Sequence, residues 1–170
     1  MQAVLSKEVT FEGHYDPFTL YRALRLINPS PYMYFMNLGD FNIIGASPEI
    51  LVQSKQGKVT IRPIAGTRKR GINSSEDLLN KIDLIEDDKE KAEHMMLVDL
   101  ARNDLSKVST VGSVNVDEMM IVEKYSHVMH MTSNVIGQKK DESTAIDCMK
   151  AALPAGTLSG APKIRAMEIL

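Results

Sequence analysis

Short runs in which hydrophobic and polar residues alternate predict strands in the first half of the chain. Four such runs occupy residues 32–38, 41–47, 50–54 and 58–64, and turns that contain Gly, Pro or Asp join them. Because consecutive strands with short connections form a meander, we expect these strands to pair antiparallel. Residues 1–8 predict a further strand.

Capping residues and helical periodicity predict helices in other parts of the chain. Asp16 and Pro17 are typical of an N-cap and a first helical residue. Residues 75–105 have helical periodicity, with a break expected near residues 86–88, and Ser143 is the expected cap of a last short helix. Residues 118–136 are rich in Val, Ile, Met and Tyr and predict two strands. The pattern therefore favours an α+β fold, a largely antiparallel sheet with helices packed on one face, without an evident internal domain boundary.

Composition narrows the class of protein. The chain has 170 residues, is 44% hydrophobic and carries a net charge of −2, which suits a globular domain and not a nucleic-acid-binding protein. No segment is long and apolar enough for a membrane span, and the N-terminal residues carry charges where a signal peptide needs an apolar run. Cys148 is the single cysteine, so no internal disulfide can form. We expect a soluble protein of the reducing cytoplasm.

Two carboxylates share one side of the helix expected over residues 89–104. At about 100° per residue, Glu93, Leu97, Leu100 and Asp104 fall on one stripe, which we expect to face the core. A buried carboxylate needs a partner. That partner is either a hard cation such as Mg²⁺, or arginine and backbone donors.

Two further segments carry candidate chemistry. His127 and His130 lie three residues apart in a strand-like run, so alternation sends them to opposite faces and excludes a two-histidine metal site. His130 is either a hydrogen-bonded core residue or a proton-transfer group. Residues 63–68 are expected to form a turn, in which Gly66 and Thr67 either donate hydrogen bonds to a carboxylate or serve only the turn.

The segment 152–170 is a loop of small residues that leads into an apolar-periodic helix with Pro162 near its start. Such a loop is either an anion pocket, with Lys163 and Arg165 adding positive charge, or a simple helix entry. The last residue, Leu170, falls inside the apolar pattern without a capping residue. We therefore expect the chain to be a piece of a longer protein.

Six motifs, taken together and in this order, resemble the chorismate-utilising enzymes, and most closely the large (component I) subunits of the anthranilate synthase type. They are NPSPYMYF (28–35), GASPEILV (45–52), RPIAGTRKRG (62–71), EHMMLVDLARNDL (93–105), EKYSHVMHMTSNVIG (123–137) and PAGTLSGAPKIRAMEIL (154–170). The resemblance covers nearly the whole chain. It implies that residues 1–170 are the central part of a chorismate-binding catalytic domain, truncated at both ends, and that the fold is part of a two-sheet sandwich.

The resemblance also implies roles for single residues. Glu93 matches a Mg²⁺ ligand, and His130 and Glu49 match an active-site histidine and a general acid for loss of the C4 hydroxyl. Substrate contacts are implied for three residues: Gly66, Thr67 and Thr157. A regulatory tryptophan site is implied for three others: Asn28, Pro31 and Met33.

The reaction implied by the resemblance is the formation of anthranilate and pyruvate from chorismate and ammonia, a lyase step of tryptophan biosynthesis. A glutamine amidotransferase subunit is the implied ammonia source, and tryptophan the implied feedback inhibitor. Aminodeoxychorismate synthase component I is the alternative, but those enzymes often carry a nucleophilic lysine where this chain has Ala65. Taken alone, the 170 residues are expected to be inactive and to self-associate, so a non-catalytic fragment is the alternative of another class.

Overall fold

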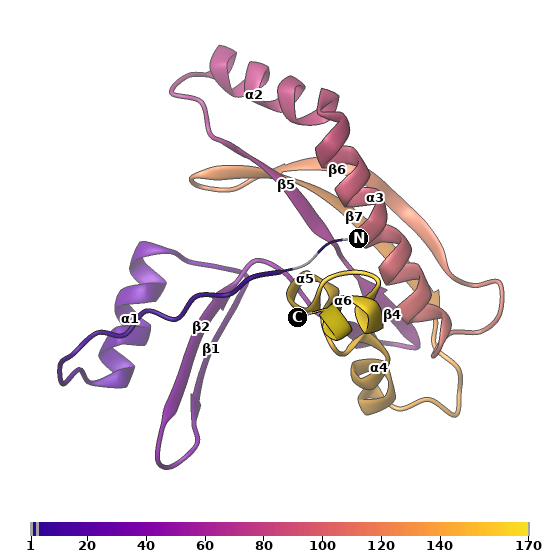
Figure 1. Ribbon diagram of the computed structural model, residues 1–170, viewed down its shortest axis with the longest axis horizontal. Coiled ribbons are helices and arrows are strands. Elements are labelled where there is room, and N and C mark those ends of the chain that lie inside the picture. The colour runs from indigo at the N-terminus through magenta and orange to yellow at the C-terminus, as the bar shows by residue number, and fades with distance from the viewer. Residues whose placement is uncertain (1, 3, 170) are drawn as a thin grey trace. The chain divides into compact units, whose positions relative to one another are not determined.

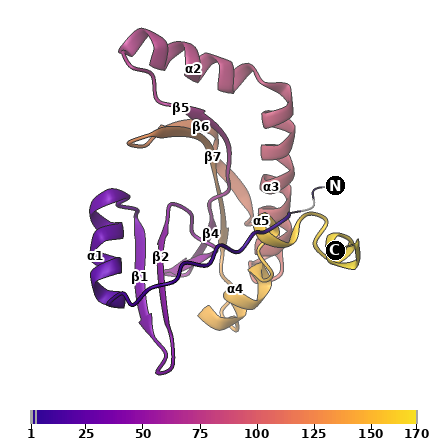
Figure 2. The ribbon, with the colours of Figure 1, turned by 60° about the vertical axis from the view of Figure 1, so that its left-hand side comes forward.

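The computed structural model describes residues 2 and 4–169, which form two compact units. We call residues 2, 4 and 51–169 the sheet unit and residues 5–50 the hairpin unit. Figures 1 and 2 show the elements of each unit from two directions. No helix within these described residues is long and apolar enough to cross a membrane.

The hairpin unit consists of one helix and one antiparallel hairpin. Asp16 accepts a hydrogen bond from the backbone N–H of Thr19 (2.7 Å) and so caps α1 (Pro17–Ile27), as predicted. The strands β1 (Tyr32–Asn37) and β2 (Asn42–Ser47) pair along their full length. Rings from α1 and β1 meet edge to face, with the centroids of Phe18 and Phe35 5.6 Å apart. None of the residues of α1 is fully buried.

The sheet unit is built around one long central strand. β7 (Val128–Gln138) pairs on one side with β6 (Asn115–Lys124), and on the other with β4 (Lys58–Ile61) and then β5 (Ile64–Lys69). β3 (Gln53–Lys55) extends the sheet beyond β4. Every pairing is antiparallel, which confirms the predicted sheet type.

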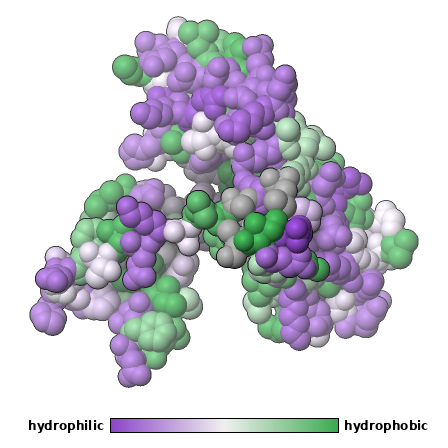
Figure 3. All heavy atoms as spheres, in the orientation of Figure 1, coloured by the Kyte–Doolittle hydropathy of each residue, from purple (hydrophilic) through white to green (hydrophobic). Residues whose placement is uncertain are grey.

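Two consecutive helices follow β5. α2 (Ser74–Glu86) ends and α3 (Asp88–Ser106) begins at Asp87, whose side chain accepts hydrogen bonds from the backbone N–H groups of Lys89 and Glu90. The predicted helix break is therefore correct, and it is an N-cap. The surface over α2 is mostly hydrophilic, with smaller hydrophobic areas (Figure 3).

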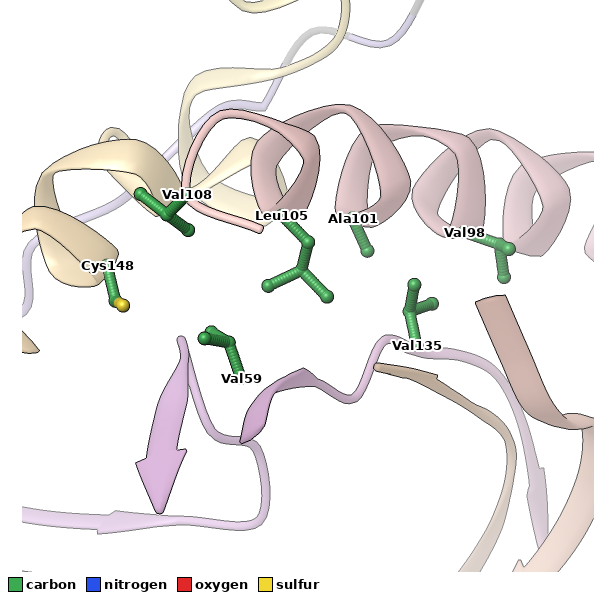
Figure 4. Close-up of a cluster of buried hydrophobic side chains, with 7 residues drawn as sticks. All are labelled: Val59, Val98, Ala101, Leu105, Val108, Val135 and Cys148. Atoms are coloured by element: carbon green, nitrogen blue, oxygen red, sulfur yellow. The ribbon is translucent and has the colours of Figure 1, made fainter. Parts of the chain in front are cut away.

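α3 covers one face of the sheet and supplies its core. Every second residue of β7, from Met129 to Val135, is buried on this face. The seven side chains of the main buried cluster come from α3, β4, β7, α4 and the residues after α3, and Figure 4 shows α3 lying over the strands. They are Val59, Val98, Ala101, Leu105, Val108, Val135 and Cys148.

Short helices complete the sheet unit. α4 (Ala145–Ala152) is capped by Thr144, one residue after the predicted cap, and the side chain of Asp147 closes a capping box. α5 (Gly156–Ser159) and α6 (Lys163–Ile169) follow. The strand predicted over residues 1–8 does not form: Gln2 makes an isolated bridge to Ala161, and residues 4–8 have no regular structure.

Candidate functional site

Gly66 lies at an irregularity in β5, where the structure places strand and not the predicted turn. Ala65 pairs with Met131 and Thr67 with His130, so Gly66 is an extra residue between two cross-strand pairs. Its φ of 74° is in the left-handed region, as in a bulge that begins with glycine. A Cβ here would lie 2.9 Å from Leu84 Cδ1 and 3.3 Å from Glu90 Oε2. The position therefore requires glycine, and the bulge takes its peptide group out of the regular ladder.

The bulge brings three of the predicted site residues together. His130 Nδ1 lies 3.0 Å from Thr67 Oγ1 and 3.2 Å from the carbonyl oxygen of Gly66. Because a carbonyl only accepts hydrogen bonds, this arrangement favours the tautomer in which Nδ1 carries the proton. The other ring nitrogen, Nε2, then has a free electron pair and can take a proton from a substrate. His130 is half-buried, on the face of β7 opposite to the buried residues that contact α3.

Charged and aromatic side chains that the sequence reasoning missed adjoin this group. The ring of Tyr125 meets the ring of His130 edge to face, with centroids 5.5 Å apart. The hydroxyl of Tyr125 donates to Glu123 Oε2 (3.0 Å), and Arg62 Nη2 donates to Glu123 Oε1 (2.5 Å). Glu123 is the cross-strand neighbour of His130. The alternation along the two predicted strands could have indicated which residues share a face with His130. It could not indicate which of them lie opposite His130, because the register between the two strands was not known.

Glu93 is half-buried on α3 and forms a second, separate grouping. Its Oε1 accepts a hydrogen bond from Gln2 Nε2 (2.8 Å), and Gln2 exchanges two backbone hydrogen bonds with Ala161, between α5 and α6. The amide oxygen of Gln2 is buried and has no hydrogen-bond partner among residues 2 and 4–169. A carboxylate beside an unpartnered amide oxygen is a donor set that suits Mg²⁺, which is often held by one or two carboxylates and completed by water and substrate oxygens. The described residues contain no cluster of three or more ligating side chains.

Asp104, the other carboxylate of the stripe, is buried and fully engaged by cations. Lys163 Nζ donates to Oδ2 (2.7 Å) and Lys107 Nζ to Oδ1 (3.0 Å). Lys163 also donates to the carbonyl of Ala152 (2.7 Å), while Arg165 pairs with the exposed Glu168. The two cations assigned to an anion pocket are therefore committed to other partners. The structure thus shows no positive charge on these two residues that is left for an anion.

The stripe was expected to face the core, and two of its residues, Leu97 and Asp104, are buried, but none of its residues belongs to the main cluster on the sheet. A Cβ on Gly156 would lie 2.0 Å from Leu100 Cδ2, so this side of α3 packs against α5. The residues of α3 that face the sheet are instead His94, Val98, Ala101 and Leu105. Glu93 thus lies beside the α5–α6 segment, which also carries the exposed Thr157.

The remaining predicted residues lie in the hairpin unit. Glu49 follows β2, where Ser47 Oγ donates to its carbonyl oxygen (2.9 Å). Asn28 is the C-cap of α1, Pro31 directly precedes β1, and Met33 is a half-buried residue of β1 opposite Ala46.

Comparison with known proteins decides the family. The family described as chorismate binding enzyme matches residues 1–170, the whole chain. The chain belongs to this family of chorismate binding enzymes. Anthranilate synthase component 1 of Pseudomonas aeruginosa is 58% identical to it over 170 residues, which are 100% of this chain and 35% of that protein. The chain thus spans about a third of the length of such curated relatives.

Solved structures of the family share the fold. The crystal structure of anthranilate synthase component I from Streptococcus pneumoniae superposes with a TM-score of 0.82 at 52% identity, covering 92% of this chain and 34% of that one. A Bacillus anthracis protein described as a 2,3-dihydroxybenzoate-specific isochorismate synthase superposes with a TM-score of 0.79 at 27% identity, covering 93% and 43% of the two chains. These matches confirm the predicted fold class and the resemblance.

Proposed function

We propose that this chain forms the central part of the catalytic domain of an anthranilate synthase component I. The observation that carries the proposal is the 58% identity to the Pseudomonas aeruginosa component 1 along all 170 residues. The relative of isochorismate synthase type is only 27% identical. The reaction converts chorismate and ammonia to anthranilate, pyruvate and water, with a glutamine amidotransferase subunit as the proposed source of ammonia.

The bulge in β5 supports a substrate-binding role for Gly66 and Thr67. An N–H group released from the ladder at Gly66 and the exposed hydroxyl of Thr67 both suit a carboxylate acceptor, and we assign them the ring carboxylate of chorismate. Thr157 is assigned to the same pocket on its match to the family motif. His130 adjoins Thr67 and offers Nε2 for proton transfer.

Two carboxylates have proposed roles in the reaction. Glu49 is assigned the proton for the departing C4 hydroxyl, on its match to the family motif. Glu93, with Gln2, is assigned to hold Mg²⁺, which when bound neutralises negative charge on the substrate. Ala65 is buried in β5 and offers no nucleophile, which favours direct attack by ammonia over a covalent step and so favours anthranilate over aminodeoxychorismate.

A chimera tests the proposal. The matching stretch of the Pseudomonas aeruginosa component 1 is replaced by this chain, and anthranilate fluorescence is followed with chorismate, ammonia and Mg²⁺. We expect turnover within about tenfold of the parent protein, and loss of Mg²⁺-dependent turnover in the matched chimera that carries Glu93→Gln. A folded chimera that converts chorismate to isochorismate or aminodeoxychorismate instead contradicts the assignment.

The 170-residue polypeptide alone has a different proposed behaviour. It corresponds to 35% of the Pseudomonas aeruginosa relative, and efficient catalysis requires all reacting groups to be positioned together, so we expect no anthranilate from it. Large hydrophobic side chains such as Leu5, Phe11 and Leu26 are at least 80% exposed, which favours self-association. Light scattering that shows a stable monomer at high concentration contradicts the second expectation.

Regulation and location complete the proposal. Asn28, Pro31 and Met33 are assigned to a feedback site for tryptophan, with the cytoplasm as the compartment of this biosynthetic enzyme. Inhibition of the chimera by tryptophan, relieved by Met33→Ala, is the expected result. Unchanged inhibition in a folded variant contradicts the assignment of Met33.

A further inference from the structure

The imidazole of His130 is held from two sides. On one side, its Nδ1 faces the Gly66 carbonyl (3.2 Å) and Thr67 Oγ1 (3.0 Å). On the other, the ring of Tyr125 packs against it at an interplanar angle of 63°. The torsion that rotates an imidazole has a broad distribution, so on a half-exposed strand face contacts at Nδ1 alone leave the ring some freedom to turn. The contact with Tyr125 limits that rotation.

Tyr125 is itself held by hydrogen bonds at its side-chain hydroxyl and at its backbone carbonyl. Its hydroxyl donates to Glu123 (3.0 Å), and Glu123 is held in turn by Arg62 (2.5 Å). Its backbone carbonyl accepts from Arg70 Nη1 (2.6 Å). The position of the aromatic ring is therefore set by Arg70, which directly follows β5, by Glu123 of β6 and by Arg62, between β4 and β5.

Arg70 has unusually rigid support. Its Nε and Nη2 donate to the two oxygens of Asp77 at 2.8 and 3.0 Å, a bidentate pair, and Lys124 Nζ adds a third donor at 2.6 Å. Asp77 is only 5% exposed, and these cations hold the pKa of its carboxyl well below the usual range. The pair thus stays charged throughout the physiological pH range and fastens the turn between β6 and β7.

We propose that Tyr125, anchored by Glu123 and Arg62, is a positioning residue that holds His130 in the orientation with Nδ1 on Gly66 and Nε2 available to substrate. The inference rests on the proposed function only in taking His130 as a group that meets the substrate. No ligand is needed to observe the orientation itself.

Nuclear magnetic resonance of the full 170-residue chain, labelled with ¹⁵N at histidine, tests the proposal. The variant His130→Gln assigns the ring signals among the four histidines. We expect the wild-type His130 to show two well-separated nitrogen shifts, with the protonated type at Nδ1. Tyr125→Leu should move the two shifts towards each other, because the freed ring populates both tautomers. Tyr32→Leu, the same change on β1, is the matched control and should leave them unchanged.

Two milder variants cover the case in which Tyr125→Leu does not fold. Tyr125→Phe keeps the ring but loses the bond to Glu123, and Glu123→Gln loses the ion pair with Arg62. Each should shift the His130 signals in the same direction as Tyr125→Leu, by a smaller amount. Wild-type tautomer shifts in every folded variant overturn the proposal.

Kinetics in the chimera separate positioning from general stability. Tyr125→Leu should lower kcat at least tenfold while changing KM less than threefold, because the ring orientation matters to proton transfer and not to carboxylate binding. A chimera without any activity refutes the proposed function but leaves the nuclear magnetic resonance result to decide on Tyr125. If Tyr125→Leu lowers both kcat and the melting temperature but leaves the His130 signals unchanged, the tyrosine is purely structural and the inference is overturned.

Discussion

The two faces of the five-stranded sheet place histidines in opposite situations. His94 reaches from α3 to the covered face, is 0% exposed, and bonds through Nε2 to Ser133 Oγ (2.7 Å). Burial lowers its pKa to about 4, so the ring is neutral at pH 7. His130 lies on the other face among Thr67, Tyr125 and Glu123, and is only half-buried. A buried histidine thus joins a helix to the sheet on one face, and a half-exposed histidine lies among polar side chains on the other.

The Ser133 hydroxyl shows how tightly the covered face is organised. Besides its hydrogen bond with His94, the Ser133 oxygen accepts a hydrogen bond from the backbone N–H of Met120 (2.9 Å). Met120 has a left-handed φ of 51°. Met120 lies at a register shift of β6, between the pairs of Glu118 and Ile121. One buried hydroxyl therefore connects α3, β7 and the irregular part of β6. Substitutions on this face should affect stability, and substitutions on the other face should affect chemistry.

The largest expected effect is on the open face. In the chimera, His130→Gln should lower kcat about 100-fold or more, the usual contribution of a positioned proton-transfer group. Because the ring is half-exposed, the free energy of unfolding should change by less than about 1 kcal/mol. His127→Gln, which changes an exposed histidine in the turn before β7, is the control and should keep normal activity. Anthranilate assays and urea unfolding give the two numbers, and a stability loss without a kcat loss would reverse the comparison.

On the covered face, Leu105→Ala should cost about 2–5 kcal/mol of unfolding free energy, because it leaves a cavity in the main buried cluster. Leu78→Ala on α2 is the matched control, since that side chain is 55% exposed, and should cost less than about 1 kcal/mol. Urea titration of the 170-residue chain measures both. Similar costs for the two leucines would show that the covered face is not the core.

The pKa of His94 makes the stability of the covered face depend on pH. The ring titrates near 6.5 in the unfolded chain and at about 4 in the folded one, so the unfolded chain binds the proton first as the pH falls. Stability is therefore complete above about pH 6.5 and is lost progressively down to about pH 4, by up to about 3 kcal/mol. In urea titrations at several pH values, His94→Gln should reduce the slope of the unfolding free energy with pH between pH 6.5 and 4, and His130→Gln should not. An unchanged slope in a folded His94→Gln variant contradicts the prediction.

Asp77 acts in a different pH window from His94. Its pKa is lowered by hydrogen bonds from Arg70, Lys124 and the backbone N–H of Gly71, so its stabilising effect is present above the usual aspartate range and is lost only as the pH falls below about 4. Asp77→Asn should therefore alter the most acidic part of the stability profile. The change between pH 6.5 and 4 should remain in this variant, since it belongs to His94.

The smallest expected effect separates the two carboxylates of α3. Asp104→Asn should cost about 1–3 kcal/mol, because it weakens buried contacts with Lys163 and Lys107, and should leave the Mg²⁺ dependence of the chimera unchanged. Glu93→Gln should instead abolish the Mg²⁺-dependent turnover of the chimera and leave its stability nearly unchanged. Mg²⁺ titration of anthranilate formation is measured beside a melting curve for each variant. Selective loss of Mg²⁺ dependence in Asp104→Asn would exchange the two assignments.

Several features could be predicted from the sequence because they depend on neighbouring residues. Asp16 and Pro17 mark the start of α1, and the acidic run around Asp87 marks the change from α2 to α3. The prediction that His127 and His130 share one strand was wrong for His127, which lies in the turn before β7, while His130 is in the strand. The family motifs identified Gly66, Thr67 and His130, which the structure brings into contact.

Other predictions failed where distant partners decide the outcome. Residues 63–68 have the composition of a turn, but pairing with β7 makes them a strand with a bulge at Gly66. Lys163 follows a loop that suits an anion, but Asp104, 59 residues earlier, takes its charge. The Glu93 stripe has the periodicity of a core face, and Leu97 and Asp104 are buried, but Leu100 packs against Gly156 of α5 and not against the sheet.

By itself, the sequence determined most of the helices and strands, the antiparallel sheet and the family. Each of these follows from local periodicity, capping or motif order, which act over a few residues. Only the tertiary structure decided the partners: Thr67 with His130, 63 positions apart, and Arg62 with Glu123, 61 apart. Such pairs depend on strand register and helix packing, which arise when distant segments bury their surfaces together.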